Sequence, residues 1–188
     1  MRMMRFHSKA KRLLLIFGVL ILVVALFFLL TKRSASKSQV TLPEQPASTA
    51  WKSTNVNREF EFPILDTNGV EVSRFKYTLI AEELRDQIIV NGQTATAVND
   101  RTFLIVTIKV TNPLDKNIQV NTRDYIRLIR NGNAGEQLAP DIHNDPVEIQ
   151  AISTKYTRVG FPINKTDTNL QLQIGEIKGT KETVDIAL

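Results

Sequence analysis

The sequence predicts an all-β domain of the sandwich type, preceded by one N-terminal transmembrane helix. Two observations carry this prediction. Residues 13–30 (LLLIFGVLILVVALFFLL) are uncharged and almost wholly apolar. From residue 58 onward, apolar and polar side chains alternate with a period of two, and turn-forming dipeptides separate the alternating segments. The chain has no cysteine, so an exported domain would depend on packing and hydrogen bonds instead of disulfides.

The apolar segment has the length and the flanking charges of a membrane anchor. A helix of its length covers about 27 Å, close to the bilayer hydrocarbon thickness of about 30 Å. Residues 1–12 hold five Lys or Arg and no acid, whereas residues 31–37 hold three. The more basic flank stays in the cytoplasm. We therefore expect a cytoplasmic tail over 1–12, a single-pass signal anchor in the lipid bilayer over 13–30, and an extracytoplasmic C-terminal domain. A cleaved signal peptide is the alternative, because Ser34-Ala35-Ser36 resembles a cleavage site, but its apolar core is usually about 7–15 residues.

Composition separates a tether from the domain and argues against nucleic acid as a partner. Residues 31–57 are rich in Ser, Thr, Ala and Pro without apolar periodicity, which predicts a flexible tether. Residues 1–57 carry nine basic residues and one acid, a balance of +8. Residues 58–188 carry fifteen against eighteen, a balance of −3, and the two sum to the net charge of +5. The positive charge thus lies around the anchor, and the domain lacks the excess of basic residues that binding of a polyanion such as nucleic acid requires.

Residues 58–188 show the pattern of half-buried strands joined by tight turns. Asn-Gly occurs at 68–69, 91–92 and 131–132, where it supplies the positive φ angles of hairpins. Residues 112–115 (NPLD) predict another turn, residues 80–85 give a weak helical signal, and residues 139–146 predict a surface loop. The predicted strands lie at 60–64, 75–79, 103–112, 118–120, 123–128, 156–163, 170–174 and 184–188. About eight strands at this spacing predict a β-sandwich.

The stretch FLIVTIKVTNPLDKNIQVNTRDYIRLIRNGN (Phe103 to Asn133), followed by YTRVGFPI (Tyr156 to Ile163), resembles a bacterial Ig-like group. This group is an exported domain-of-unknown-function family, similar to immunoprotective extracellular proteins. The resemblance implies an Ig-like β-sandwich outside the cytoplasm and no catalytic residues. The sequence departs from common members because it has no cysteine to carry a lipid and has Ala151-Ile152-Ser153-Thr154 where they often have Pro-Gly.

The candidate binding residues are Arg123, Tyr125 and Arg127. On a strand their side chains would share one face. Arginine offers planar donors for carboxylate or phosphate, and tyrosine adds a stacking ring. Such a stripe suits an acidic cell-envelope polymer or the acidic edge of a protein. The alternative is a solvated sheet face whose charge is balanced by Asp124 and Glu136.

Other polar clusters give weaker signals for chemistry. Asp141, His143 and Asp145 would share a face of an extended loop, but calcium prefers more oxygen ligands and zinc more nitrogen or sulfur. A solvated loop is therefore expected, with no metal and no cofactor. His143 is the only histidine of the exported part, which argues against a Ser-His-acid triad. The adjacent Glu82 and Glu83 do not establish the carboxylate spacing that glycoside hydrolysis needs. We expect no catalytic residues and no enzymatic activity.

These observations favour a membrane-anchored, non-catalytic interaction module for protein or cell-envelope components. Edge strands of such a domain can accept a strand from a partner. The alternative is a structural or lipid-transport bridge subunit of an envelope complex, which would need an open apolar groove.

Overall fold

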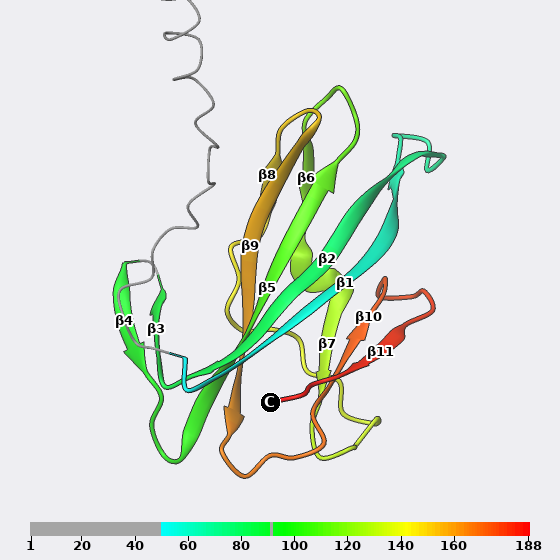
Figure 1. The fold of residues 1–188 in the computed structure, drawn as a ribbon. Helices are drawn as coiled ribbons and strands as arrows, with labels where there is room; N and C mark the ends of the chain where they lie inside the picture. Colours follow the sequence, from blue (N-terminus) through cyan, green and yellow to red (C-terminus); the bar gives the residue numbers. More distant parts are fainter. Residues whose placement is uncertain (1–49, 91) are drawn as a thin grey trace, which may run out of the picture. The chain divides into compact units, whose positions relative to one another are not determined.

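The computed structural model describes residues 50–90 and 92–188, which form an all-β fold of antiparallel strands (Figure 1). The predicted cytoplasmic tail, the predicted transmembrane helix 13–30 and most of the predicted tether lie outside the described residues. Within those residues, no helix combines the length and the apolar character that crossing a bilayer requires.

Two sheets carry most of the strands. The larger has the order β1-β2-β5-β9, and the smaller has the order β11-β10-β7. The chain fills β1, β2 and β5 as neighbours, crosses to the smaller sheet for β7, returns for β9 and ends with β10 and β11. The short pair β3-β4 extends from this body, whereas the short pair β6-β8 packs against the larger sheet and contributes Val120, Val147 and Ile149 to the core. The 3-10 helix η2 precedes β7 (Figure 1). The bounds are β1 Lys52–Leu65, β2 Glu71–Arg85, β3 Gln87–Val90, β4 Gln93–Thr96, β5 Arg101–Asn112, β6 Ile118–Val120, η2 Thr122–Tyr125, β7 Ile126–Ile129, β8 Val147–Ile149, β9 Ser153–Asn164, β10 Gln171–Ile174 and β11 Glu182–Asp185.

The core lies between the two larger sheets, as in a sandwich, because both contribute to one cluster of buried apolar side chains. The predicted apolar face of 103–112 is confirmed: its even positions on β5 are completely buried, namely Leu104, Val106, Ile108 and Val110. Ile105 points to the other face and is also buried, because the loop residue Ile142 forms a bridge with Gly160 on the neighbouring β9. A Cβ on Gly160 would lie 2.8 Å from Cδ1 of Ile105, so only glycine lets this loop lie so close to the sheet.

The turn predictions are confirmed where the structure describes them. Gly69 lies between β1 and β2 with φ +80°, and Gly92 lies between β3 and β4 with φ +76°. The carboxylate of Asp66 accepts hydrogen bonds from the backbone N–H groups of Asn68 and Val70, at 2.8 and 2.9 Å. This Asx-type arrangement stabilises the first hairpin.

Asn112 joins two distant turns. Its side-chain amide donates to the carbonyls of Lys116 and Gln150, at 2.8 and 2.9 Å, while its Oδ1 accepts from the backbone N–H of Leu114 at 3.0 Å. The side chain is 1 % exposed. The Thr-Asn ending of β5, which contributed to the family resemblance, therefore has a structural role at this position.

Two sequence predictions about the first two strands differ from the structure. The first strand begins at Lys52, inside the segment predicted as tether. The weak helical signal over 80–85 was wrong, because these residues belong to β2. A register shift between Leu79 and Ala81 breaks the alternation there, so buried positions change from odd numbers to even ones. Such a bulge removes the period that identifies a strand in sequence.

Candidate functional site

The predicted stripe of Arg123, Tyr125 and Arg127 does not lie on one strand face. Arg123 and Tyr125 belong to the 3-10 helix η2, and only Arg127 lies on a strand, β7. Because a 3-10 helix places successive side chains about a third of a turn apart, alternate residues do not share a face. The prediction of a common strand face was wrong, and the structure separates the tyrosine from the two arginines.

The two arginines lie near each other on the outside of this turn. Nη1 of Arg127 donates to the backbone carbonyls of Arg123 and Ile126, at 2.6 and 2.7 Å. Nη1 of Arg123 lies 3.2 Å from Nε2 of His143, in the 139–146 loop. One guanidinium therefore stabilises the junction of η2 and β7, while the other remains exposed. Binding of an acidic polymer by this pair stays a prediction.

Tyr125 instead packs into a cluster of four aromatic rings. Its ring centroid lies 4.5 Å from that of Phe62, 5.3 Å from Phe75 and 5.9 Å from Tyr77. The hydroxyl of the fully buried Tyr77 donates to the backbone carbonyl of Thr122 at 3.1 Å, which holds η2 against the larger sheet. Tilted and edge-on rings at these separations attract one another beyond the effect of burial alone.

Asp145 also holds η2 in place. Its Oδ1 accepts from the backbone N–H and the hydroxyl of Thr122, at 2.8 and 2.7 Å, and its Oδ2 accepts from the backbone N–H of Arg123 at 2.9 Å. The carboxylate thus satisfies the free donors at the start of the helix, as an N-cap residue does. This role explains the acid in the loop that the sequence marked as a weak cation candidate. Within residues 50–90 and 92–188, no group of three or more His, Cys, Asp or Glu could hold a metal ion.

The aromatic cluster borders a surface hollow of about 330 Å³ at the end of the β1–β2 hairpin. We call it the aromatic groove. Its walls come from segments that are distant in the chain, namely β1, β2, β6, η2 and the segment after β10. It is lined by Pro63, Ile64, Leu65, Phe75, Ile118, Gln119, Val120, Asn121, Asp124, Tyr125 and Glu176.

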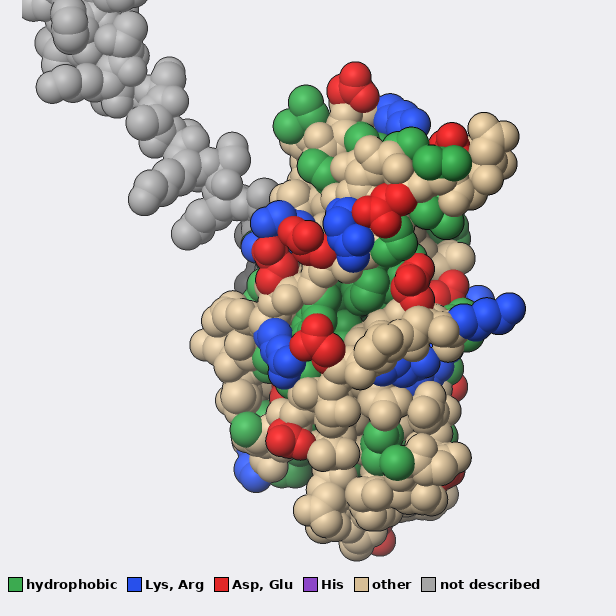
Figure 2. All heavy atoms as spheres, turned by 90° about the vertical axis from the view of Figure 1, so that its right-hand side faces the viewer, with side chains coloured by type: hydrophobic (Ala, Val, Ile, Leu, Met, Phe, Trp, Pro, Cys, Tyr) green, Lys and Arg blue, Asp and Glu red, His purple; other side chains and the backbone are tan. Residues whose placement is uncertain are grey.

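The groove combines apolar walls with two carboxylates. Leu65 is 55 % exposed at its rim, and Ile177, next to the lining residue Glu176, is 57 % exposed. Burial raises the pKa of the Tyr125 hydroxyl, and the nearby negative charges of Glu176 and Asp124 raise it further. Figure 2, which faces the side of the β10–β11 hairpin, shows apolar side chains at the surface between acidic and basic ones.

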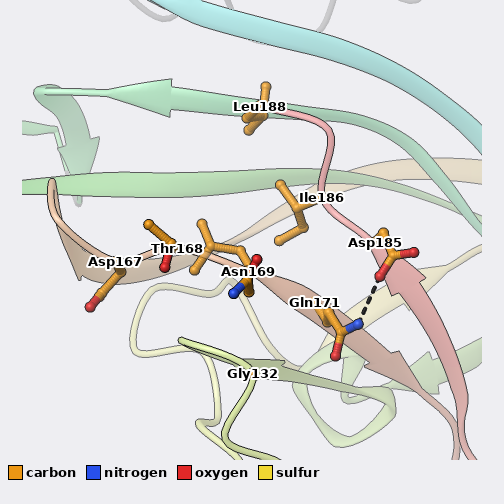
Figure 3. Close-up of a pocket in the computed structure, with 9 residues that line it drawn as sticks. Gly132, Asp167, Thr168, Asn169, Gln171, Asp185, Ile186 and Leu188 are labelled. Carbon is orange, nitrogen blue, oxygen red and sulfur yellow. Dashed lines mark hydrogen bonds between the residues drawn. The ribbon is translucent and has the colours of Figure 1, made fainter.

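A larger hollow of about 530 Å³, the C-terminal crevice, lies beside β10 and the segment after β11 (Figure 3). Its two carboxylates are already engaged. Asp167 accepts from Nη1 of Arg130 at 3.3 Å and from the backbone N–H of Asn164 at 2.9 Å, whereas Asp185 accepts from the amide of Gln171 at 2.8 Å. These carboxylates stabilise local turns and strand pairing, which leaves them poorly suited to bind a cation or to transfer a proton.

Glu82 is the most unusual titratable group of the described domain. Its side chain is fully buried, and neither carboxyl oxygen has a hydrogen-bond partner among the described residues. Burial raises its pKa from 4.5 to about 7. The adjacent Glu83 faces the other side of β2, where its carboxylate pairs with Nε of Arg85 at 3.0 Å. The two glutamates therefore do not converge on a common site.

Sequence reasoning missed the aromatic groove, because its residues come from five separate segments. The sequence pattern predicted Phe62 and Phe75 as ordinary core residues of strands, and Tyr125 as a surface residue of a strand. The partial signal was Asn121, directly after the predicted strand 118–120, because asparagine is a favoured residue at the start of a helical turn.

The comparisons with known proteins concern the fold. The chain matches no family model and no curated protein. It is similar to the crystal structure of a conserved hypothetical protein from Bacillus anthracis, with a TM-score of 0.50 and 14 % identity over 73 % of this chain and 99 % of that one. A functionally unknown protein from Listeria monocytogenes matches with a TM-score of 0.44 and 11 % identity, over 73 % of this chain and 84 % of that one. The Bacillus structure supports the fold and assigns no activity.

Proposed function

We propose that the chain is a single-pass membrane protein that displays an Ig-like sandwich outside the cytoplasm as a non-catalytic interaction module. Its partner would be a protein of the cell envelope, bound at the aromatic groove. The anchor part rests on the apolar segment 13–30 and its flanking charges. The binding part rests on the geometry of the described domain.

The Ig-like assignment is one of architecture and not of connectivity. The two larger sheets are antiparallel and hold four and three strands, as in an immunoglobulin constant-type domain. In that domain the third strand lies in the smaller sheet. Here the corresponding strand, β5, stays beside β2 in the larger sheet. We propose that the chain belongs among the bacterial sandwiches that share the Ig layers with a different strand order.

The observation that carries the proposed function is the aromatic groove itself. It places Tyr125, which is half-buried, beside the exposed Leu65 on a rigid framework of strands. Aromatic and aliphatic anchors next to a pocket are the features that dominate the energy of protein interfaces. The lipid-transport alternative has less support, because the groove is small and two carboxylates line it.

In-cell photo-cross-linking tests the binding proposal. A benzoyl-phenylalanine replaces Leu65 at the groove in the full chain, and a matched control variant carries it at Gln93, an exposed residue of the β3–β4 hairpin. We expect a discrete cross-linked protein from the groove position that the control does not capture. Equal cross-linking at both positions, or none at the groove, would contradict the proposal.

Cysteine labelling tests the membrane orientation. The chain has no native cysteine, so single substitutions report unambiguously on their own positions. In spheroplasts, a membrane-impermeant maleimide should label Thr94→Cys at once and Ser8→Cys only after lysis. The reverse order would show that the orientation is wrong.

A further inference from the structure

The two carboxylates of the aromatic groove lack partners within the described part of the chain. Asp124 and Glu176 accept no side-chain hydrogen bond and form no ion pair with a described residue, whereas most other acids of the domain are paired. Examples of paired acids are Glu59 with Lys76 at 2.8 Å and Glu182 with Arg58 at 2.7 Å. No Lys, Arg or His lines the groove. Negative charge at the groove is therefore left uncompensated by the described residues that line it.

The carboxylates flank a ring that suits a cation. Tyr125 and Phe75 both line the groove, Phe62 packs against both rings, and both carboxylates act electrostatically on the Tyr125 hydroxyl. A cation above an aromatic face is attracted by the electrons of the ring, and a neighbouring carboxylate adds to this attraction. Ile64, Leu65 and Ile118 surround the position with apolar surface that would contact the stem of a long basic side chain and its apolar neighbours.

We propose that the aromatic groove recognises a peptide segment in which a lysine or arginine is flanked by apolar side chains. The basic group would lie between the carboxylates of Asp124 and Glu176, and the flanking side chains would contact the apolar walls. This inference rests on the proposed function and specifies the chemistry of the partner. Charge would mainly determine which segments bind, because complementary charges govern specificity more than affinity.

Fluorine NMR on the full chain in non-ionic detergent micelles tests the inference. The chain has three tyrosines: Tyr125 in the groove, Tyr77 in the core and Tyr156 on β9 outside the groove. Labelling with 3-fluorotyrosine therefore gives a groove signal together with internal controls. The probes are the peptides acetyl-Ile-Arg-Ile-Lys-Ile-amide and acetyl-Ile-Gln-Ile-Gln-Ile-amide, which share their isoleucines and differ in having basic or neutral polar side chains between them. We expect the basic peptide to shift the Tyr125 resonance saturably and the neutral peptide to have little effect.

Variants separate the carboxylates from general charge. Asp124→Asn and Glu176→Gln should each weaken binding of the basic peptide by about two- to fivefold, as expected for exposed ion pairs. The matched control Asp141→Asn, an exposed acid of the 139–146 loop, should leave binding unchanged. Equal binding of both peptides, or unchanged binding by the double variant, would overturn the inference while a cross-link at Leu65 would still support the proposed function. A shift of Tyr125 by phosphatidylcholine vesicles but not by the peptide would also overturn it.

Discussion

The fully buried carboxyl of Glu82 makes the stability of this domain depend on pH in an unusual direction. Its pKa is about 7 in the folded protein against 4.5 for the free side chain. Between these values the native state holds a proton that the unfolded chain has lost. The contribution of Glu82 to stability is therefore complete below pH 4.5 and is lost as the pH rises through 7. A difference of this size corresponds to about 3 kcal/mol at 1.36 kcal/mol per pH unit.

The substitution Glu82→Gln removes the titration and keeps the shape of the side chain. The assay is urea unfolding of the full chain in non-ionic detergent, followed by circular dichroism at several values between pH 5 and pH 8.5. The offset between the two proteins at pH 5 measures the exchange of carboxyl for amide. Because the wild type has already lost part of the Glu82 contribution at pH 5, the glutamine variant should gain about 2.5 kcal/mol over the wild type by pH 8.5, relative to that offset. Glu148→Gln, at an exposed position of β8, is the control. It shows whether removal of an exposed carboxyl changes the pH dependence as removal of the buried one does.

Parallel stability curves for wild type and Glu82→Gln would refute this reasoning. They would mean that the carboxyl is hydrated or paired at neutral pH in the folded protein. Several other carboxylates act in the opposite direction, because hydrogen bonds to Lys76, Val70 and Lys165 lower the pKa values of Glu59, Asp66 and Asp86. Their contributions are lost only as the pH falls through those lowered pKa values, so they do not obscure the change above pH 5.

Three further substitutions probe contacts that position the groove and its surroundings. Asn112→Ala should destabilise the protein by about 2–4 kcal/mol, because it leaves two carbonyls and an N–H of neighbouring turns without their partner. Gly160→Ala should cost about 1–3 kcal/mol, because the added methyl group meets Ile105 and Ile142. Asp145→Asn should destabilise the protein by about 1–3 kcal/mol. It should also accelerate hydrogen exchange at the backbone N–H of Thr122, which donates a hydrogen bond to the Asp145 carboxylate.

Urea unfolding measures the first two of these predictions, and hydrogen exchange by mass spectrometry measures the third. Asp141→Asn, in the same loop as Asp145, is the control that should change neither stability nor exchange. Wild-type stability of the Asn112 or Gly160 variant would show that the turn contacts or the close loop approach are not maintained in solution. Unchanged exchange in the Asp145 variant would show that another group caps η2.

The strands of the larger sheet were predictable because burial on one face imposes a period of two. The buried even positions of β5 and the turn at Asn68-Gly69 illustrate this. The end of β2 was not predictable, because a register shift after Leu79 interrupts the period of two and the charged residue Glu82 occupies a buried position. The site was less accessible to sequence reasoning. Tyr125 lies on η2 and not on a strand, since its position depends on Asp145 and on the hydroxyl of Tyr77.

The amino-acid sequence predicted the strands of the described domain, because side-chain alternation and turn residues act over a few neighbouring positions. It also supplied the charge asymmetry that predicts the membrane orientation. The folded chain was needed to show that rings from β1, β2 and η2 meet beside two carboxylates that lack a partner among the described residues. It was also needed to show that one glutamate of an adjacent pair is buried. These outcomes depend on strand register and on contacts between segments that are distant in the chain, which local preferences do not encode.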